Sequence, residues 1–495
     1  MSNFLLENKK LIYRLCEILP GAFSWSLILF PFWGSFLIPA WVAYYIIAFD
    51  VYWFYRSTSI AILALLAHYK IKAYTNFDWL GDVKLFPDWG RVHHVIIIPT
   101  FKEPLHTLER TLRGLVLQTY PLGKICVVVS FEEREGREAK LKAESLRKEF
   151  AKKFGFFYAT FHPDIAGEVK GKSSNTAWAA KFIKKKLIDS QILDLDYVTI
   201  TSEDADAILH PNYLSCLTFK FLDDPDRHEK IFQPAIHFYN NIWDVPVVTR
   251  VFNTTSSVIQ TGQLLRKDRL INFSTYSTSF AMIIKVGFWD TDVIPEDYRI
   301  FFKSFYALKG KVTVEPIFLP VFEDAAQSTT FLKSLVNQYE QVKRWAWGAS
   351  DDAYIIWGWL TTKEINFWQK SIRAAKVLED HFLWPVNWFA ITIGAALPPI
   401  LNKDFGRTIL GKTLPQVSSA ILTLSLVSLL LIIIIDWRQR PKRPAGMSRF
   451  RQIISPFEYI LLPVVGFFFG ALPGIDAHTR LMLGKYIEYR VTEKV

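Results

Sequence analysis

Residues 197–206 read YVTITSEDAD, a short β-branched run that ends in closely spaced carboxylates. Such a run predicts a buried strand, with Asp204 and Asp206 at its carboxyl end. In open α/β sheets, ligands bind at that end of the strands. The same Asp-x-Asp spacing also occurs at residues 194–196, 224–226 and 290–292. Position therefore singles out Asp204 and Asp206, which as an isolated pair could equally form a solvated acidic turn.

The segments around this strand alternate between short apolar runs and helical patterns. Further strands are expected at residues 94–99, 124–130 and 156–161, and helices at residues 107–117, 140–154 and 175–187. Apolar strands that alternate with amphipathic helices predict a doubly wound, mainly parallel α/β sheet. This is the fold class that we expect for the soluble part of the chain.

The composition indicates a membrane protein with a large soluble part. Of the 495 residues, 51% are hydrophobic, 16% aromatic and only 21% charged, which excludes intrinsic disorder. The three cysteines, Cys16, Cys126 and Cys216, lie far apart without a CxxC pair. This spacing excludes a cysteine-built zinc site and argues against a disulfide framework.

Two groups of apolar segments flank the soluble part. Between Glu17 and Asp50 the chain has no charged residue, which is long enough for two spans that break near Pro39. Three more stretches follow at residues 382–401, 414–435 and 460–472. The last of these is short and contains glycine and proline, so that it could span the membrane or turn back within it.

The loop between the last two apolar stretches is strongly basic. Its cations are Arg438, Arg440, Lys442, Arg443, Arg449 and Arg451. The positive-inside rule places this loop in the cytosol, whereas the side of the C-terminus stays open. We therefore expect an integral protein of the plasma (inner) membrane, with membrane regions at residues 1–69 and 381–495 and a cytosolic domain at residues 70–380.

Three further motifs carry candidate functional residues. Residues 167–173, GEVKGKS, have one residue too few between the glycines for a phosphate-binding P-loop, although Lys172 and Asn175 could still meet a phosphate. Residues 295–297, PED, open a helical pattern, where a carboxylate is often only a helix cap. Residues 341–345, QVKRW, combine a guanidinium with an indole ring and could also form an interfacial belt.

Taken in order, these motifs resemble the membrane-embedded family 2 glycosyltransferases with a GT-A fold, which include cellulose, chitin and hyaluronan synthases. The resemblance runs from about His94 to Gly348. It implies an inverting hexosyltransferase that takes a sugar from a nucleotide-sugar donor, expected to be a UDP-sugar. The acceptor would be a polysaccharide or a lipid-linked sugar at the cytosolic face of the bilayer, with polymer synthesis slightly favoured.

The resemblance also assigns roles to individual residues. It implies a divalent metal, Mg or Mn, at Asp204 and Asp206, and Asp297 as the base that activates the acceptor. The nucleotide-sugar would contact Thr100, Glu103, Lys172, Asn175 and Asp204. The acceptor and the diphosphate would contact Glu296, Gln341, Arg344 and Trp345.

The chain departs from the family pattern after the second expected strand. The family has an Asp-Asp pair there that holds uracil, whereas residues 127–136 read VVVSFEEREG. Glu132 or Glu133 would take the place of this pair, which leaves the identity of the base open.

Two other function classes are alternatives to a glycosyltransferase. A transporter or channel with a cytosolic regulatory domain is suggested by Asp50, which lies at the edge of an apolar run. The net charge of +11 could suit nucleic acid, but much of the excess lies in loops next to the membrane segments, and no nucleic-acid-binding motif is present. We therefore expect no nucleic-acid partner.

Overall fold

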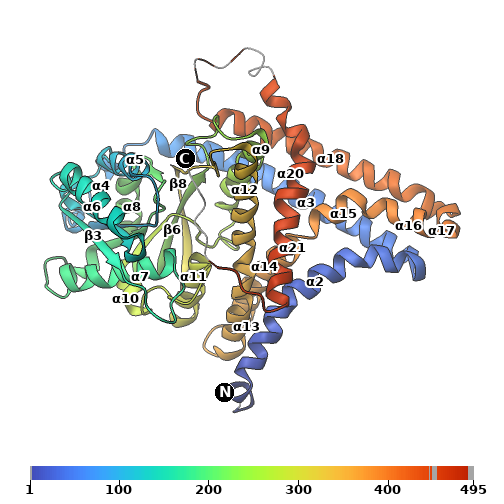
Figure 1. Cartoon of the computed structure of the whole chain (residues 1–495), viewed down its shortest axis with the longest axis horizontal. Coiled ribbons are helices and arrows are strands. Elements are labelled where there is room, and N and C mark those ends of the chain that lie inside the picture. Colours follow the sequence, from blue (N-terminus) through green and yellow to red (C-terminus); the bar gives the residue numbers. More distant parts are fainter. Residues whose placement is uncertain (1–2, 445, 447, 449–453, 489–495) are drawn as a thin grey trace.

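The protein, described here by a computed structural model, consists of a sheet-containing part and a long helical arm (Figure 1). The structure describes residues 3–444, 446, 448 and 454–488. Arg449 and Arg451, which were expected in the cytosolic loop, lie outside the described residues.

The sheet has a parallel half and a mixed half. In the described part of the chain it contains eight strands in the order β3-β2-β1-β4-β7-β6-β8-β5. The first four positions are parallel, whereas β7 runs antiparallel to both β4 and β6. The strands are β1 (His93–Thr100), β2 (Ile125–Glu132), β3 (Phe156–His162), β4 (Val198–Ser202), β5 (Ile208–Leu209), β6 (Lys230–His237), β7 (Tyr276–Ser279) and β8 (Thr313–Phe322). The mainly parallel α/β sheet expected from the sequence is therefore present.

Helices cover both faces of this sheet. Along β1, Val95 and Ile97 belong to one buried core, while Ile96 and Ile98 belong to the other, as the two-residue period of a strand requires. The first core includes side chains from α7 (Lys172–Ile183), α10 (Phe280–Lys285) and α11 (Glu296–Ala307). The second includes side chains from α5 (Leu105–Val116), α6 (Arg137–Phe150) and α8 (Tyr213–Asp223). The sheet is thus buried on both faces, which explains its continuous apolar runs.

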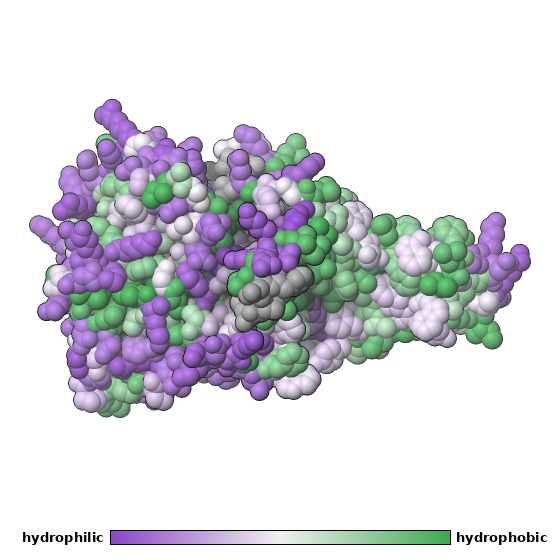
Figure 2. Space-filling view, turned by 90° about the horizontal axis from the view of Figure 1, so that it is seen from below, coloured by the Kyte–Doolittle hydropathy of each residue, from purple (hydrophilic) through white to green (hydrophobic). Residues whose placement is uncertain are grey.

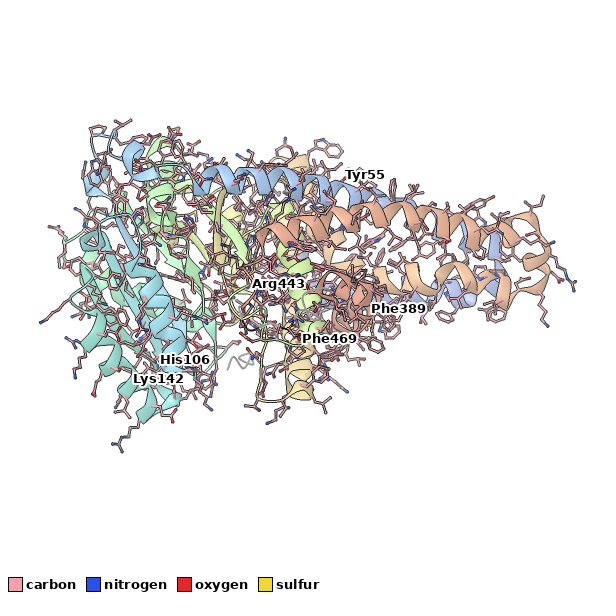
Figure 3. The ribbon with its side chains drawn as sticks, turned by 90° about the horizontal axis from the view of Figure 1, so that it is seen from above. Tyr55, His106, Lys142, Phe389, Arg443 and Phe469 are labelled. Carbon is pink, nitrogen blue, oxygen red and sulfur yellow. The ribbon has the colours of Figure 1, made fainter. Side chains whose placement is uncertain are left out.

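The arm is built from segments at the two ends of the chain. Its helices are α2 (Lys9–Leu37), α3 (Pro39–Thr75), α15 (Asn387–Ile393), α16 (Leu397–Leu401), α17 (Lys403–Arg407) and α18 (Ile409–Gln439). Helices α3 and α18 run side by side along the arm (Figures 1 and 3). With 37 residues, α3 is about 55 Å long, so it extends from the tip of the arm to the sheet.

A layer of helices lies between the arm and the sheet. It contains α9 (Val247–Gln263), α12 (Phe331–Ala346), α13 (Asp352–Thr361), α14 (Phe367–Leu383), α20 (Leu462–Gly466) and α21 (Leu472–Met482). In Figure 1, α20 and α21 run beside α12 and across the direction of α18. Other short α-helices are α1 (Asn3–Glu7) and α4 (Trp79–Val83), and short 3-10 and π helices occur as well, among them Ser455–Leu461 and Phe467–Ala471.

Three helical segments among the described residues are long and apolar enough to cross a membrane. They are Lys9–Leu37, Ile409–Gln439 and Phe457–Met482, and the bent pair Phe367–Leu383 and Asn387–Leu401 would make a fourth. Helix α3, which contains the second span expected near the N-terminus, is not among them, because tyrosines and Arg56 interrupt its apolar stretch. Figure 2 shows hydrophobic residues over most of the arm and hydrophilic residues at its tip and over the sheet-containing part.

Candidate active site

The candidate site lies at the carboxyl ends of the parallel strands. Thr100 ends β1, Glu132 ends β2, and Asp204 and Asp206 follow β4 directly. Because these strands are parallel neighbours, their carboxyl ends meet at one edge of the sheet. All four residues line one cavity with a volume of about 810 Å³, which continues from the sheet edge to the helices of the arm.

Asp204 is held by a cation and a hydroxyl group. The Lys172 Nζ lies 2.7 Å from Asp204 Oδ1, and the Ser274 hydroxyl donates to Asp204 Oδ2 at 2.9 Å. Its backbone N–H donates to Thr275 Oγ1 at 3.1 Å. One carboxylate oxygen thus meets Lys172 and the other meets Ser274, at the edge of the cavity.

Lys172 reaches this position because of a glycine turn. Gly171, directly before α7, has φ +155° and ψ −161°, a conformation that is essentially restricted to glycine. From the first turn of α7, Lys172 Nζ also contacts Glu296 Oε1 at 3.0 Å and donates to the Ser274 carbonyl at 2.7 Å. Burial lowers the pKa of Lys172, but Asp204 and Glu296 outweigh it and raise the pKa well above its usual value. The amine therefore stays charged.

Asp297 and Glu296 stand at the start of α11 and face the same cavity. Asp297 Oδ2 accepts from the Ser274 N–H at 3.2 Å, and Asp297 Oδ1 accepts from the Tyr298 N–H at 2.9 Å. Burial raises the pKa of Asp297, and Lys172 partly opposes the increase. Burial also raises the pKa of Glu296, to about 7.

Ser274 joins the two carboxylate groups. Its hydroxyl contacts Asp204 and its N–H contacts Asp297, so the acidic residues that follow β4 and those that open α11 share one neighbour. Ser274 has φ +57°, in the left-handed region that a non-glycine residue adopts at a cost. Strain of this kind clusters at functional sites. The sequence analysis missed this residue, which lies in a loop with many serines and threonines.

Two further carboxylates at this edge were also missed. Glu323 follows β8 and accepts from the Thr275 hydroxyl at 3.2 Å and from the Ser274 hydroxyl. Glu203 is fully buried next to Asp204, and burial raises its pKa well above the usual value. Glu323 has the same sequence feature that singled out Asp204, because it is a carboxylate that follows a buried strand.

Asp206 is oriented by the chain that follows β8. The backbone N–H of Asp324 donates to Asp206 Oδ2 at 2.8 Å. Both oxygens of the Asp324 carboxylate accept from Arg110 Nη2 at 2.7 Å, which ties this loop to α5. Asp206 is almost fully buried, and it lines the cavity beside Asp204.

The residues expected to contact the nucleotide lie at the same edge, with one exception. Glu103 lines the cavity and accepts from the Thr100 hydroxyl at 2.6 Å. Asn175 also lines it, but its amide nitrogen donates to the Ser130 carbonyl at 2.7 Å, which ties α7 to β2. Glu132 contacts Arg134 Nε at 2.5 Å, whereas Glu133 lies outside the described cavity lining.

Helix α12 brings Gln341, Arg344 and Trp345 to the wall of the same cavity. The Trp345 ring stacks on Phe238 and Phe252, with centroids 5.6 and 6.2 Å away. Gln341 is buried. The cavity thus brings together twelve of the thirteen residues singled out from the sequence, all except Glu133.

The oxygen donors at Asp204 and Asp206 fit a hard divalent cation. Among the described residues no group of three or more His, Cys, Asp or Glu side chains is arranged to hold a metal. Mg²⁺ commonly uses only one or two carboxylates together with substrate phosphates and waters. The two neighbouring aspartates on the cavity wall match that smaller donor set.

Comparisons with known proteins give weak similarities only. No family model and no curated protein sequence matches the chain. A solved mannosyltransferase from Pyrobaculum calidifontis, in complex with GDP-Man and Mn²⁺, aligns with a TM-score of 0.44 and 14% identity over 78% of this chain and 99% of that chain. Residues 1–349 of S. aureus TarS in complex with UDP align with a TM-score of 0.36 and 11% identity over 81% and 94%. TM-scores below 0.5 assign neither a fold family nor a function.

Proposed function

We propose that the protein is a membrane-bound inverting glycosyltransferase with a GT-A-type sheet, which transfers a sugar from a nucleotide-sugar. One observation carries the proposal: Asp204 and Asp297 come from distant parts of the chain, both contact Ser274, and both line one cavity. The cavity begins at the sheet edge where α/β proteins bind ligands and ends among the helices of the arm.

In the proposed reaction Asp297 is the base. It removes the proton from an acceptor hydroxyl while the oxygen attacks the anomeric carbon of the sugar. The bond from that carbon to the diphosphate breaks on the opposite face, so the configuration inverts. A base works best when its pKa lies near the operating pH, and burial shifts the pKa of Asp297 in that direction.

The leaving diphosphate needs positive charge, and Lys172 is a buried cation next to Asp204 that supplies it. Arg344, which lines the same cavity, would add a second cation. A divalent metal held by Asp204 and Asp206 would supply further neutralisation of the diphosphate. Thr100, Glu103 and Glu132 would form the nucleotide end of the site.

The experiment that tests the proposal is a donor screen. The purified full chain in detergent, with a membrane lipid extract as the source of acceptor, is incubated with a panel of nucleotide-sugars and Mg²⁺ or Mn²⁺, and release of nucleoside diphosphate is measured. Asp297→Asn keeps the shape of the side chain but removes the base, so transfer should fall by about 10²–10⁴-fold. The matched control is Asp292→Asn, five residues earlier and exposed outside the cavity lining.

The two possible failures have different meanings. If no nucleotide-sugar in the panel releases its diphosphate, the proposed function is wrong. If the diphosphate is released and Asp297→Asn transfers sugar as fast as Asp292→Asn, only the assignment of the base is wrong.

A further inference from the structure

The cavity has an apolar half that the proposed chemistry does not use. Beyond Asp297 its wall is formed by residues of α3, α15, α18 and α20. The lining side chains of this half are mostly apolar, among them Trp53, Ile60, Trp388, Leu422, Leu426 and Leu462, and its polar members include Ser57, Asn387, Thr392 and Ser425. Trp53 and Trp388 come from separate helices, with ring centroids 6.4 Å apart. A wall of this composition suits a hydrocarbon chain better than a hydrated sugar chain.

This apolar half opens towards the outside of the arm. Leu426 lines the cavity and is nevertheless 57% exposed. It lies in Ile409–Gln439, the most apolar of the candidate membrane spans. Because the surroundings of such a helix are lipid, the cavity opens sideways at α18, where a lipid tail can enter.

The far end of the arm is closed. In the described part of the chain, the cavity lining reaches no further towards the tip than Trp53 on α3, Thr392 on α15 and Leu422 on α18. Beyond these residues the arm is filled by a packed cluster, which contains Val42, Ala43, Ile46, Phe405 and Leu414. A polymer that is extruded needs a passage through this region, and the packed side chains occupy it.

Charged groups line the cavity next to these apolar side chains. Arg56 on α3 pairs with Asp380 and Glu379 on α14, and Arg269 pairs with the same two carboxylates at 3.0 and 3.2 Å. Arg56 and Asp380 line the cavity. Charged side chains beside an apolar wall fit a lipid, whose headgroup and tail need these two kinds of surroundings.

We infer that the acceptor is a membrane lipid whose headgroup bears a free hydroxyl, with its tail in the groove between α3, α15 and α18. This inference depends on the proposed function and names the acceptor of the same site. A hydroxyl is required because Asp297 needs a proton to remove, whereas an ionised phosphate acceptor would need no base. The product is a glycolipid that carries one added sugar, and growth of an extruded polymer is excluded.

The test uses the full chain in phosphatidylcholine nanodiscs, whose headgroup has no hydroxyl, with a radiolabelled nucleotide-sugar that the donor screen has identified. The acceptor probes are 1,2-dioleoylglycerol, its monoglucoside, and a polyprenyl-diphosphate-linked sugar, each in a separate reaction. We expect label in the organic phase, as a product with a single added sugar, for at least one probe. The probe that is labelled identifies the source of the hydroxyl.

Two substitutions in α18 test where the lipid tail binds. Leu426→Trp would fill the groove, and Leu430→Trp is its matched control, because Leu430 is also 57% exposed on α18 but is not part of the described lining. Lipid glycosylation should fall at least tenfold in Leu426→Trp and less than twofold in Leu430→Trp. Binding of the nucleoside diphosphate to both variants reports whether the sheet is folded.

Several results would overturn the inference while the proposed function stands. These are diphosphate release with label only in a water-soluble or insoluble polymer, diphosphate release with no labelled lipid for any probe, and equal lipid glycosylation by Leu426→Trp and Leu430→Trp. If no nucleotide-sugar releases its diphosphate, the proposed function itself fails and the inference fails with it.

Discussion

Lys172 connects the donor side of the proposed site with the side of the proposed base. Its amine contacts Asp204, on the donor side, and Glu296, which precedes the proposed base. Removing a partner from a buried ion pair leaves an uncompensated charge, which costs far more than the pair contributes. The positive charge of Lys172 therefore keeps this group of carboxylates together and holds down the pKa of Asp297.

This coupling predicts the pH dependence of catalysis. Asp297 acts as a base only when it is deprotonated, so the rate falls as the pH drops through its pKa. Since burial raises this pKa, the acid limb of kcat should lie at higher pH than for an ordinary aspartate. Lys172→Met removes the charge that opposes the increase and should move the limb to still higher pH.

The measurement is the dependence of log kcat on pH for the wild type, for Lys172→Met and for a control variant, Lys170→Met. Lys170→Met is the control, because Lys170 is half exposed and pairs with Asp164 away from the carboxylates. Lys172→Met also loses a charge that faces the diphosphate, so its rate should be lower at every pH. An acid limb at the same pH as in Lys170→Met would contradict the coupling.

Single residues of the site could be predicted from the sequence where they directly follow an element with a clear pattern. Asp204 and Asp206 were found because a β-branched run ends two residues earlier, and Asp297 because it opens a helical pattern. Ser274 could not be found, since its role depends on a left-handed backbone in a loop that has no periodicity. Glu323 was missed because β8 contains two prolines, which weaken its strand pattern.

At the scale of elements, the parallel half of the sheet was predictable and the mixed half was not. The strands at 93–100, 125–132, 156–162 and 198–202 have short apolar runs that alternate with helices. Strand β7 has only four residues, YSTS, and its place between β4 and β6 is set by long-range pairing. No local pattern encodes such pairing.

Helices α9 and α3 pack closely against each other beside the cavity. A Cβ on Gly262 of α9 would lie 2.9 Å from the Ile60 carbonyl oxygen and 3.0 Å from the Ala64 nitrogen of α3. Both neighbours are backbone atoms and cannot turn aside. Ile60 and Gln263 line the cavity, so the close approach of these helices positions its wall.

Gly262→Ala should therefore push α9 and α3 apart. We expect a loss of about 1–3 kcal/mol in stability, as for other overpacked contacts, and weaker sugar transfer because the cavity wall moves. Thermal unfolding in detergent and the transfer assay measure the two effects. Gly90→Ala is the control, since a Cβ there has nothing within 4 Å. Equal unfolding temperatures for the two variants would show that the helices can adjust.

At the scale of the whole molecule, the sequence indicated where the membrane segments are but not how they assemble. The apolar stretches at both ends of the chain were recognised, because hydropathy alone reveals them. Their packing into one arm, with the cavity between α3, α15 and α18, depends on contacts between residues more than 300 positions apart. The 51° bend between α14 and α15 likewise has no counterpart in hydropathy.

The arm predicts the orientation of the protein in the membrane. The tip, with Arg407 in α17, and the segment after α18, with Lys442, lie at opposite ends of the 31-residue helix α18. If α18 spans the bilayer, Lys442 lies on the side of the catalytic domain and Arg407 on the other side. Cys16, Cys126 and Cys216 are all buried, so an introduced cysteine can be labelled against a low background.

In sealed right-side-out vesicles, whose interior corresponds to the cytosol, a membrane-impermeant maleimide should label Arg407→Cys directly. It should label Lys442→Cys only after the vesicles are opened with detergent, because the bilayer then separates the reagent from the thiol. Both positions are exposed in the folded chain, so accessibility and not burial decides the result. Labelling of both variants before the detergent is added would show that α18 does not cross the bilayer, and the sideways opening at Leu426 would then face water instead of lipid.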